Sequence, residues 1–228
     1  MKDAREQKGR ARCERCGACC EKGGPALHGE DLALWKKGIL PPSALMTLRK
    51  GEVARDDVAE TLAPLSGEIV KVKSAPGKTA CVFYRGKKKG CGIYADRPLE
   101  CRLLSCRDTA AIAAAYDRDR LRRADLIGSD AKLAPLVAAH EERCSLLKVA
   151  RMAAELSGPG GEAAASALLD LLQYDHFMRP FLAQKAGIRA EDMDFLFGRP
   201  LSEAIAGFGL AVRREGNRFT LCPWYDLT

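Results

Sequence analysis

The chain has 228 residues, of which 47% are apolar and 29% charged, and its formal net charge is +7. This length suffices for one large domain or two small ones. Residues 1–12 contain no apolar stretch, and no apolar run approaches the ~18–20 residues of a membrane span. We therefore expect a cytoplasmic protein without a secretory signal or a membrane segment. The positive charge by itself does not identify a partner.

Ten cysteines are a large number for a protein of a reducing compartment. Because disulfides are rare there, cysteine-rich segments point to metal ligation instead. Four of the thiols fall within the eight-residue run Cys-Glu-Arg-Cys-Gly-Ala-Cys-Cys at residues 13–20. Thiols at such intervals can turn toward one centre, as zinc and iron–sulfur clusters require. The run therefore predicts a metal site.

The first half of the chain is predicted to contain short elements joined by loops. Residues 1–12 are highly charged and are expected to be flexible. The spacing of apolar residues favours short helices at residues 28–37, at about 42–50 and around 56–62. Alternation of apolar and polar residues favours strands at residues 68–73 and 80–84.

A turn at residues 85–90 is expected to join the second of these strands to residues 91–94 in a hairpin. The three lysines at residues 87–89 would be its solvated tip. Beyond it, residues 99–107 are expected to begin a short helix or turn that carries Cys101 and Cys106.

The second half is rich in alanine and leucine and is predicted to be mainly helical. Asp108 or Thr109 is expected to cap a helix that ends near residue 123. Two longer helices are expected at about residues 131–156 and 162–178, the latter ending before Pro180 because proline cannot continue the helical hydrogen bonds.

Shorter elements are expected to close the chain. Two short helices are predicted at about residues 190–197 and 201–206. A hairpin of residues 209–213 and 218–222 is predicted around Gly216-Asn217.

Together these patterns define an α+β protein, in which a cysteine-rich domain with short helices and a small antiparallel sheet precedes a mainly helical region. The expected boundaries are a flexible N-terminus at 1–12, a metal-binding domain at 13–108 and a helical region at 109–228 that ends in a hairpin.

A second group of cysteines follows the first at wider intervals, and the two groups are expected to meet around metal. The eight predicted ligands are Cys13, Cys16, Cys19, Cys20, Cys81, Cys91, Cys101 and Cys106. Thiolates are soft ligands that select zinc, iron–sulfur clusters or copper(I). Adjacent side chains point in different directions, so Cys19 and Cys20 do not easily share one tetrahedron. Eight thiols suit two four-coordinate centres or one cubane cluster with spare thiols.

Residues beside the predicted ligands are candidates to tune the site. Arg97 and Arg102, with Arg107 further on, would offset the negative charge of thiolates, and we assign Arg97 and Arg102 as cofactor-binding residues. Gly17 and Gly92 would let backbone amides approach the sulfurs. Tyr94 and Pro98 are expected to pack over the site.

Other residues are interpreted as structural. His140 and Cys144 stand four apart on a predicted helix and could act as ligands, but a surface histidine and a buried cysteine are preferred. His28 is assigned to a helix start, and His176 and Cys222 to packing.

The cysteine motifs resemble those of a known family. Cys-x2-Cys-Gly-x-Cys-Cys is followed by Cys81-x-Phe83 and by Cys91-x-Ile-Tyr94-x2-Arg97-Pro98-x2-Cys101-Arg102. This pattern resembles the YkgJ family of cysteine-cluster proteins, a zinc- or iron-chelating domain that has a relative in flagellin lysine N-methylase. The resemblance covers residues 13–107 and departs at Ser105, where a proline often stands. It implies that the eight cysteines bind metal.

The predicted function is therefore binding of an iron–sulfur cluster, of the 4Fe-4S type, or of zinc. The alternative is an iron–sulfur enzyme related to protein-lysine N-methylase or a redox protein, so enzymatic activity is left open. No phosphate loop, nucleotide fingerprint or Ser–His–Asp order is present. Nucleic-acid binding ranks last, because few aromatic residues accompany the basic segments.

Overall fold

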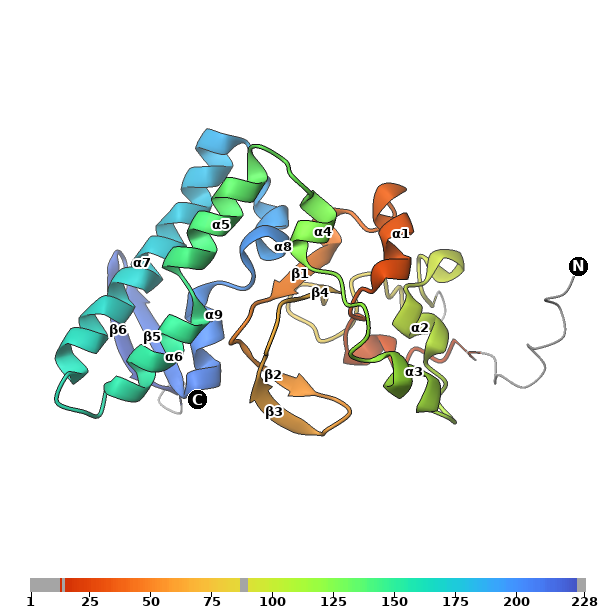
Figure 1. The fold of residues 1–228 in the computed structure, drawn as a ribbon, viewed down its shortest axis with the longest axis horizontal. Helices are drawn as coiled ribbons and strands as arrows, with labels where there is room; N and C mark the ends of the chain where they lie inside the picture. Colours follow the sequence, from red (N-terminus) through yellow and green to blue (C-terminus); the bar gives the residue numbers. More distant parts are fainter. Residues whose placement is uncertain (1–12, 14, 87–89, 225–228) are drawn as a thin grey trace, which may run out of the picture. The chain divides into compact units, whose positions relative to one another are not determined.

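A computed structural model describes Cys13, residues 15–86 and residues 90–224 (Figure 1). Their contacts group into two compact units, each made of two segments: the described residues of Met1–Pro41 with Lys71–Leu121, and of Pro42–Val70 with Arg122–Thr228. Short helices and two-stranded sheets recur through the chain, with longer helices in the second unit. The predicted α+β class is thus confirmed.

The expected domain boundaries at residues 12 and 108 stay a prediction. The predicted flexible N-terminus and the lysine tip at residues 87–89 lie outside the described residues. Among the described residues, no helix has both the length and the apolar character needed to span a membrane.

The described residues of the first unit form three short α-helices, single 3₁₀ turns and isolated bridges joined by loops. The helices are α1 (Leu32–Lys36), α2 (Leu99–Leu103) and α3 (Ala110–Ala115). Single turns of 3₁₀ helix occur at Cys20–Lys22, Gly29–Asp31 and Tyr94–Asp96. The strand expected at residues 80–84 is reduced to two isolated antiparallel bridges, Ser74↔Cys81 and Tyr84↔Cys91. Such sparse secondary structure leaves much of the backbone to be fixed by side chains.

Buried polar groups supply that constraint between α2 and the chain that follows the first cysteine run. Glu100 on α2 accepts a hydrogen bond from the amide of Ala26 at 2.8 Å and contacts His28 Nε2 at 3.2 Å. Asp31, which is fully buried, accepts hydrogen bonds from the amides of His28 at 3.0 Å and Leu99 at 2.8 Å. Removing one partner would leave a buried polar group unpaired, so these bonds hold the two segments in register.

The described residues of the second unit form three long helices, three short ones and three strand pairings. The long helices are α5 (Leu133–Arg143), α6 (Leu146–Glu155) and α7 (Gly161–Ala186), and the short ones are α4 (Arg123–Ile127), α8 (Met193–Phe197) and α9 (Leu201–Ala204). Its strands are β1 (Leu45–Leu48), β2 (Val53–Asp56), β3 (Thr61–Pro64), β4 (Ile69–Val72), along which the chain passes into the first unit, β5 (Leu210–Glu215) and β6 (Arg218–Pro223). β1 pairs with β4, β2 with β3, and β5 with β6.

An apolar core joins α6, α7, α9 and the β5–β6 hairpin, which lie together in Figure 1. Leu146, Val149, Leu168, Leu201 and Ile205 are all fully buried in it. Full burial of one such side chain contributes roughly 1.5–3 kcal/mol, so this cluster is a main source of stability for the second unit.

Two helices expected in the first half are wrong. Residues 42–50 form only a 3₁₀ turn before β1, whose Thr47 is fully buried and donates a hydrogen bond to the carbonyl of Phe195 at 2.6 Å. Residues around 56–62 belong to the β2–β3 hairpin, in which Val53 pairs with Pro64 and Asp56 with Thr61. At residues 45–48 a partner distant in the sequence outweighs a weak helical pattern, and at residues 53–64 a local hairpin does so.

Three of the helix boundaries expected in the second half are also wrong. The helix predicted to end near residue 123 stops at Ala115. The helix predicted for residues 131–156 is broken into α5 and α6 at Ser145, whose backbone is extended. Conversely, α7 continues through Pro180 to Ala186 and ends at Gly187, which has a left-handed backbone. The closing short helices and the β5–β6 hairpin are confirmed.

Candidate metal centre

A cavity of about 180 Å³ in the first unit is lined by most of the predicted ligands. The cysteines on its wall are Cys13, Cys16, Cys19, Cys20, Cys91, Cys101 and Cys106. Cys81 is buried next to it, since its amide donates a hydrogen bond to the carbonyl of Cys20, a residue of the wall. The fold therefore gathers both cysteine groups, distant in sequence, around one space.

Backbone hydrogen bonds tie the two groups of cysteines to each other. The amide of Cys81 donates to the carbonyl of Cys20 at 2.7 Å, and the amide of Tyr84 to the carbonyl of Cys81 at 2.9 Å. Tyr84 in turn forms the antiparallel bridge to Cys91. Helix α2 then carries Cys101 to the same wall. The path Cys20–Cys81–Cys91 is thus continuous through main-chain contacts.

Gly17 lies so close to Tyr84 that a side chain at this position would displace the tyrosine ring. Its φ is +86°, a left-handed conformation that favours glycine. A Cβ atom at this position would stand 2.2 Å from the hydroxyl oxygen of Tyr84. The amide of Glu21 donates to the Gly17 carbonyl at 2.9 Å, and Tyr84 hydrogen-bonds the Glu21 carboxylate at 3.2 Å. The first cysteine loop is therefore seated directly against the tyrosine ring.

Two arginines stack on Tyr94 at the cavity wall. The guanidinium carbon of Arg15 lies 3.8 Å from the ring centroid, and that of Arg97 lies 3.9 Å from it. Two guanidinium groups so close to one centroid occupy opposite faces of the ring, because they would otherwise overlap. Arg15 has a left-handed φ of 56°, and its amide donates to Cys13 Sγ at 3.4 Å. This stack connects the first cysteine loop to the segment before α2.

The thiols of the cavity resist deprotonation while they face one another. Burial raises the pKa of Cys20 to about 12, and the neighbouring Cys19 adds to the rise. Burial likewise raises the pKa values of Cys81 and Cys101. A bound cation would reverse this effect, because it stabilises the thiolates that serve as its ligands. The donor set, made of sulfur, suits zinc or iron–sulfur clusters.

The predicted basic residues divide between the cavity and the surface around it. Arg97 and Arg107 line the cavity. Arg102 donates to the Glu30 carboxylate at 3.0 Å and is absent from the lining, and its cofactor-binding role stays a prediction. Arg15 and Tyr84 line the cavity but were not predicted from sequence. The position of Arg15 between Cys13 and Cys16 was the available signal.

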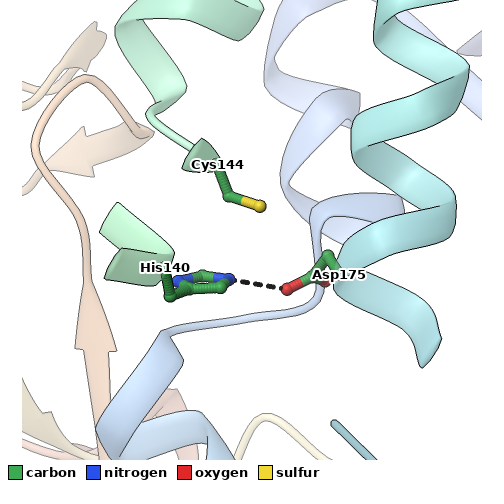
Figure 2. A group of neighbouring side chains, drawn as sticks. All are labelled: His140, Cys144 and Asp175. Atoms are coloured by element: carbon green, nitrogen blue, oxygen red, sulfur yellow. Dashed lines mark hydrogen bonds and ion pairs between the residues drawn. The ribbon is translucent and has the colours of Figure 1, made fainter. Parts of the chain in front are cut away.

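A second group of possible ligands lies in the second unit, as Figure 2 shows. His140, Cys144 and Asp175 are buried, and their donor atoms lie within 4.8 Å of one another, the one trio of this kind among the described residues. His140 Nε2 donates to Asp175 Oδ1 at 2.9 Å, since an ionised carboxylate can only accept. The prediction of a surface histidine is therefore wrong, whereas Cys144 is buried as expected.

The surroundings of this trio are those of a polar core network. Asp175 already accepts hydrogen bonds from Arg179 and from the amide of Leu201, the latter at 2.8 Å. Burial lowers the pKa of His140, and the guanidinium groups of Arg49 and Arg179 lower it further. The same two cations would repel an added metal ion. Burial also raises the pKa of Cys144 to about 12, which disfavours it as a nucleophile.

His28 and Cys222 lie outside the cavity lining. Both ring nitrogens of His28 are engaged, Nδ1 with the carbonyl of Arg118 at 2.6 Å and Nε2 with Glu100. The thiol of Cys222 donates to the Ala211 carbonyl at 3.7 Å across the β5–β6 hairpin. These contacts give both residues structural roles.

The fold and the cavity define a small cysteine-rich domain whose side chains suit metal chelation. Residues 12–114 match the family CxxCxxCC, described as a "putative zinc- or iron-chelating domain". This match confirms the resemblance to YkgJ-type proteins over residues 12–114. No curated protein and no solved structure matches the chain.

Proposed function

We propose that the chain binds an iron–sulfur cluster or zinc through the eight cysteines of its first unit. The observation that carries this proposal is the cavity wall, to which residues 13–20 and 91–106 contribute seven thiols, with Cys81 beside them. Seven thiols around one space exceed what packing requires, because buried cysteines otherwise behave as scattered small apolar residues.

Bound metal would also stabilise the first unit. The helices among its described residues have at most six residues, and its chain segments are joined largely by isolated hydrogen bonds. Ligation across the cavity would add cross-links between residues far apart in sequence, and in such domains the free energy of metal binding becomes free energy of folding. Zinc would supply this structural role, and an iron–sulfur cluster would supply electron transfer as well.

The charges around the wall fit a centre built from thiolates. Four thiolates on one divalent ion leave a net charge of about −2. Arg15 and Arg97, stacked on Tyr94, offset that charge without competing for the sulfurs. Because binding requires deprotonation of thiols whose pKa values are raised, we expect affinity to increase with pH.

Anaerobic purification with metal and sulfide analysis tests the proposal. Iron together with sulfide, and absorption at about 400 nm from thiolate-to-iron charge transfer, would identify an iron–sulfur cluster. Stoichiometric zinc in a colourless protein would identify a structural zinc ion. Cys101→Ser should lower the metal content, whereas the matched control Cys222→Ser, outside the cavity lining, should not. Equal metal content in Cys101→Ser and the unsubstituted protein would contradict the proposal.

The second candidate function is an iron–sulfur enzyme, such as a protein-lysine methylase or a redox protein. It is favoured by the side chains without sulfur that share the cavity wall, among them Tyr84, Tyr94 and Arg107. These groups could contact a substrate beside the metal. Calorimetric titration of the metal-loaded protein with S-adenosylmethionine tests the methylase version, and no heat of binding would count against it.

A further inference from the structure

The eight cysteines of the first unit differ in their access to solvent. Cys13, Cys16 and Cys106 are exposed, and Cys81 is buried. The other four are half-buried. The ligands of a single compact metal centre would have similar exposure to solvent. The differing exposure of the eight thiols therefore indicates that they do not all bind one centre.

The exposed thiols are neighbours of one another. Among the neighbouring thiols, that of Cys16 has the largest electrostatic effect on Cys106, followed by those of Cys19 and Cys13, and all four residues line the same cavity. The amide of Arg15 donates to Cys13 Sγ, which keeps that sulfur turned toward its own loop. The outer set is therefore defined as Cys13, Cys16, Cys19 and Cys106.

The more buried thiols form a different neighbourhood. The thiol of Cys101 is affected electrostatically most by Cys81, and then by Cys19, Cys20 and Cys91. Main-chain contacts connect Cys20, Cys81 and Cys91. The amide of Cys81 donates to the carbonyl of Cys20, and Tyr84, whose amide donates to Cys81, forms the antiparallel bridge to Cys91. The inner set is therefore defined as Cys20, Cys81, Cys91 and Cys101.

We propose that the two sets form two adjoining metal centres of four thiolates each, an inference that rests on the proposed function. Cys19 lies between the sets and completes the outer one, because the adjacent Cys20 is bound through its carbonyl to Cys81. Cys19 and Cys20 are adjacent in sequence, and Cys19 has the largest electrostatic effect of any thiol on Cys20, so the two centres meet there. The ligand class is a soft divalent ion such as zinc.

Binding has to draw the sulfurs of each set inward. Sulfurs around one zinc ion stand about 3.8 Å apart, from Zn–S bonds of about 2.3 Å. Among the described residues, no three sulfurs of the cavity lie within 4.8 Å of one another. Three members of the outer set, Cys13, Cys16 and Cys106, are exposed, whereas Cys20 and Cys81 of the inner set are joined by a main-chain hydrogen bond. We therefore expect the outer ion to exchange faster than the inner ion.

Release of zinc to a chromogenic chelator tests the division in the full chain. The unsubstituted, zinc-loaded protein should release two equivalents in two phases of equal amplitude, with rates at least tenfold apart. The double variant Cys16→Ser/Cys106→Ser should lose the fast phase and keep the slow one. Both substitutions lie at exposed positions, and circular dichroism reports whether the fold is retained. The control Cys222→Ser should keep both phases.

The outcomes separate this inference from the proposed function. A protein that takes up no zinc and holds no iron overturns both. Zinc uptake with release in one phase, or a double variant that loses both phases or neither, overturns the division while metal binding stands. Selective loss of the fast phase supports it.

Discussion

Gly17→Ala tests whether the first cysteine loop is seated on Tyr84 as the structure has it. A left-handed φ costs a residue with a Cβ about 1–2 kcal/mol. The new Cβ would also stand 2.2 Å from the Tyr84 hydroxyl, and overpacking of this kind costs about 1–3 kcal/mol. We expect the free energy of unfolding of the first unit to fall by about 2–5 kcal/mol, the sum of both terms.

Gly77→Ala is the matched control for this variant. Gly77 also has a left-handed φ, of 67°, but a Cβ there would meet nothing within 4 Å. The backbone cost is common to both variants, so their difference of about 1–3 kcal/mol isolates the overlap with the ring. Urea titration read by hydrogen-exchange mass spectrometry of peptides from 71–121 measures the first unit separately. Equal losses in the two variants would refute the seating of residue 17 on Tyr84.

The remaining predictions concern a buried carboxylate and the arginine stack. Asp175→Asn should destabilise the second unit by about 3–5 kcal/mol, because the Arg179 guanidinium loses its charged partner and buried His140 loses the carboxylate that accepts its hydrogen bond. Exposed Asp170→Asn should change little, and equal losses would contradict the buried network. Burial raises the pKa of Asp175, but His140 and Arg179 outweigh it and hold the pKa at about 2, below the ordinary 3.8. Its stabilising contribution is thus present above pH of about 4 and is lost as pH falls to about 2, by roughly 2 kcal/mol, and acid titration of Asp175→Asn should lack this step. Arg15→Ala should speed zinc release about 2–5-fold, as expected for the loss of one exposed cation–π contact. The control Arg118→Ala, at an exposed position outside the cavity lining, should leave the release rate unchanged, and identical rates in the two variants would exclude a role for the stack.

Several elements could be predicted because their signals are local. The β5–β6 hairpin follows from alternating residues around Gly216-Asn217, where the left-handed φ of 61° at Gly216 suits the turn. Strand β4 and helix α2 follow similarly from short-range pattern. The cysteine spacings predicted the ligand candidates, since thiol chemistry is a property of residue type rather than of fold.

Other features were decided by contacts that no local pattern contains. Residues 45–48 form a strand in which Thr47 donates a hydrogen bond to the carbonyl of Phe195. Helix α5 ends at a turn whose Cys144 carbonyl accepts a hydrogen bond from buried Arg49 at 3.0 Å. Helix α7 passes through Pro180, since the apolar contacts of its buried face outweigh the loss of one backbone donor.

The sequence by itself determined which side chains are available for metal and that they fall into two groups along the chain. Only the tertiary structure decided that seven of them share one cavity wall, that Arg15 and Arg97 enclose Tyr94 there, and which sulfurs are neighbours. The physical reason is that spacing restricts only residues a few positions apart. Neighbours such as Cys16 and Cys106 are brought together by backbone hydrogen bonds and buried polar pairs formed elsewhere in the unit.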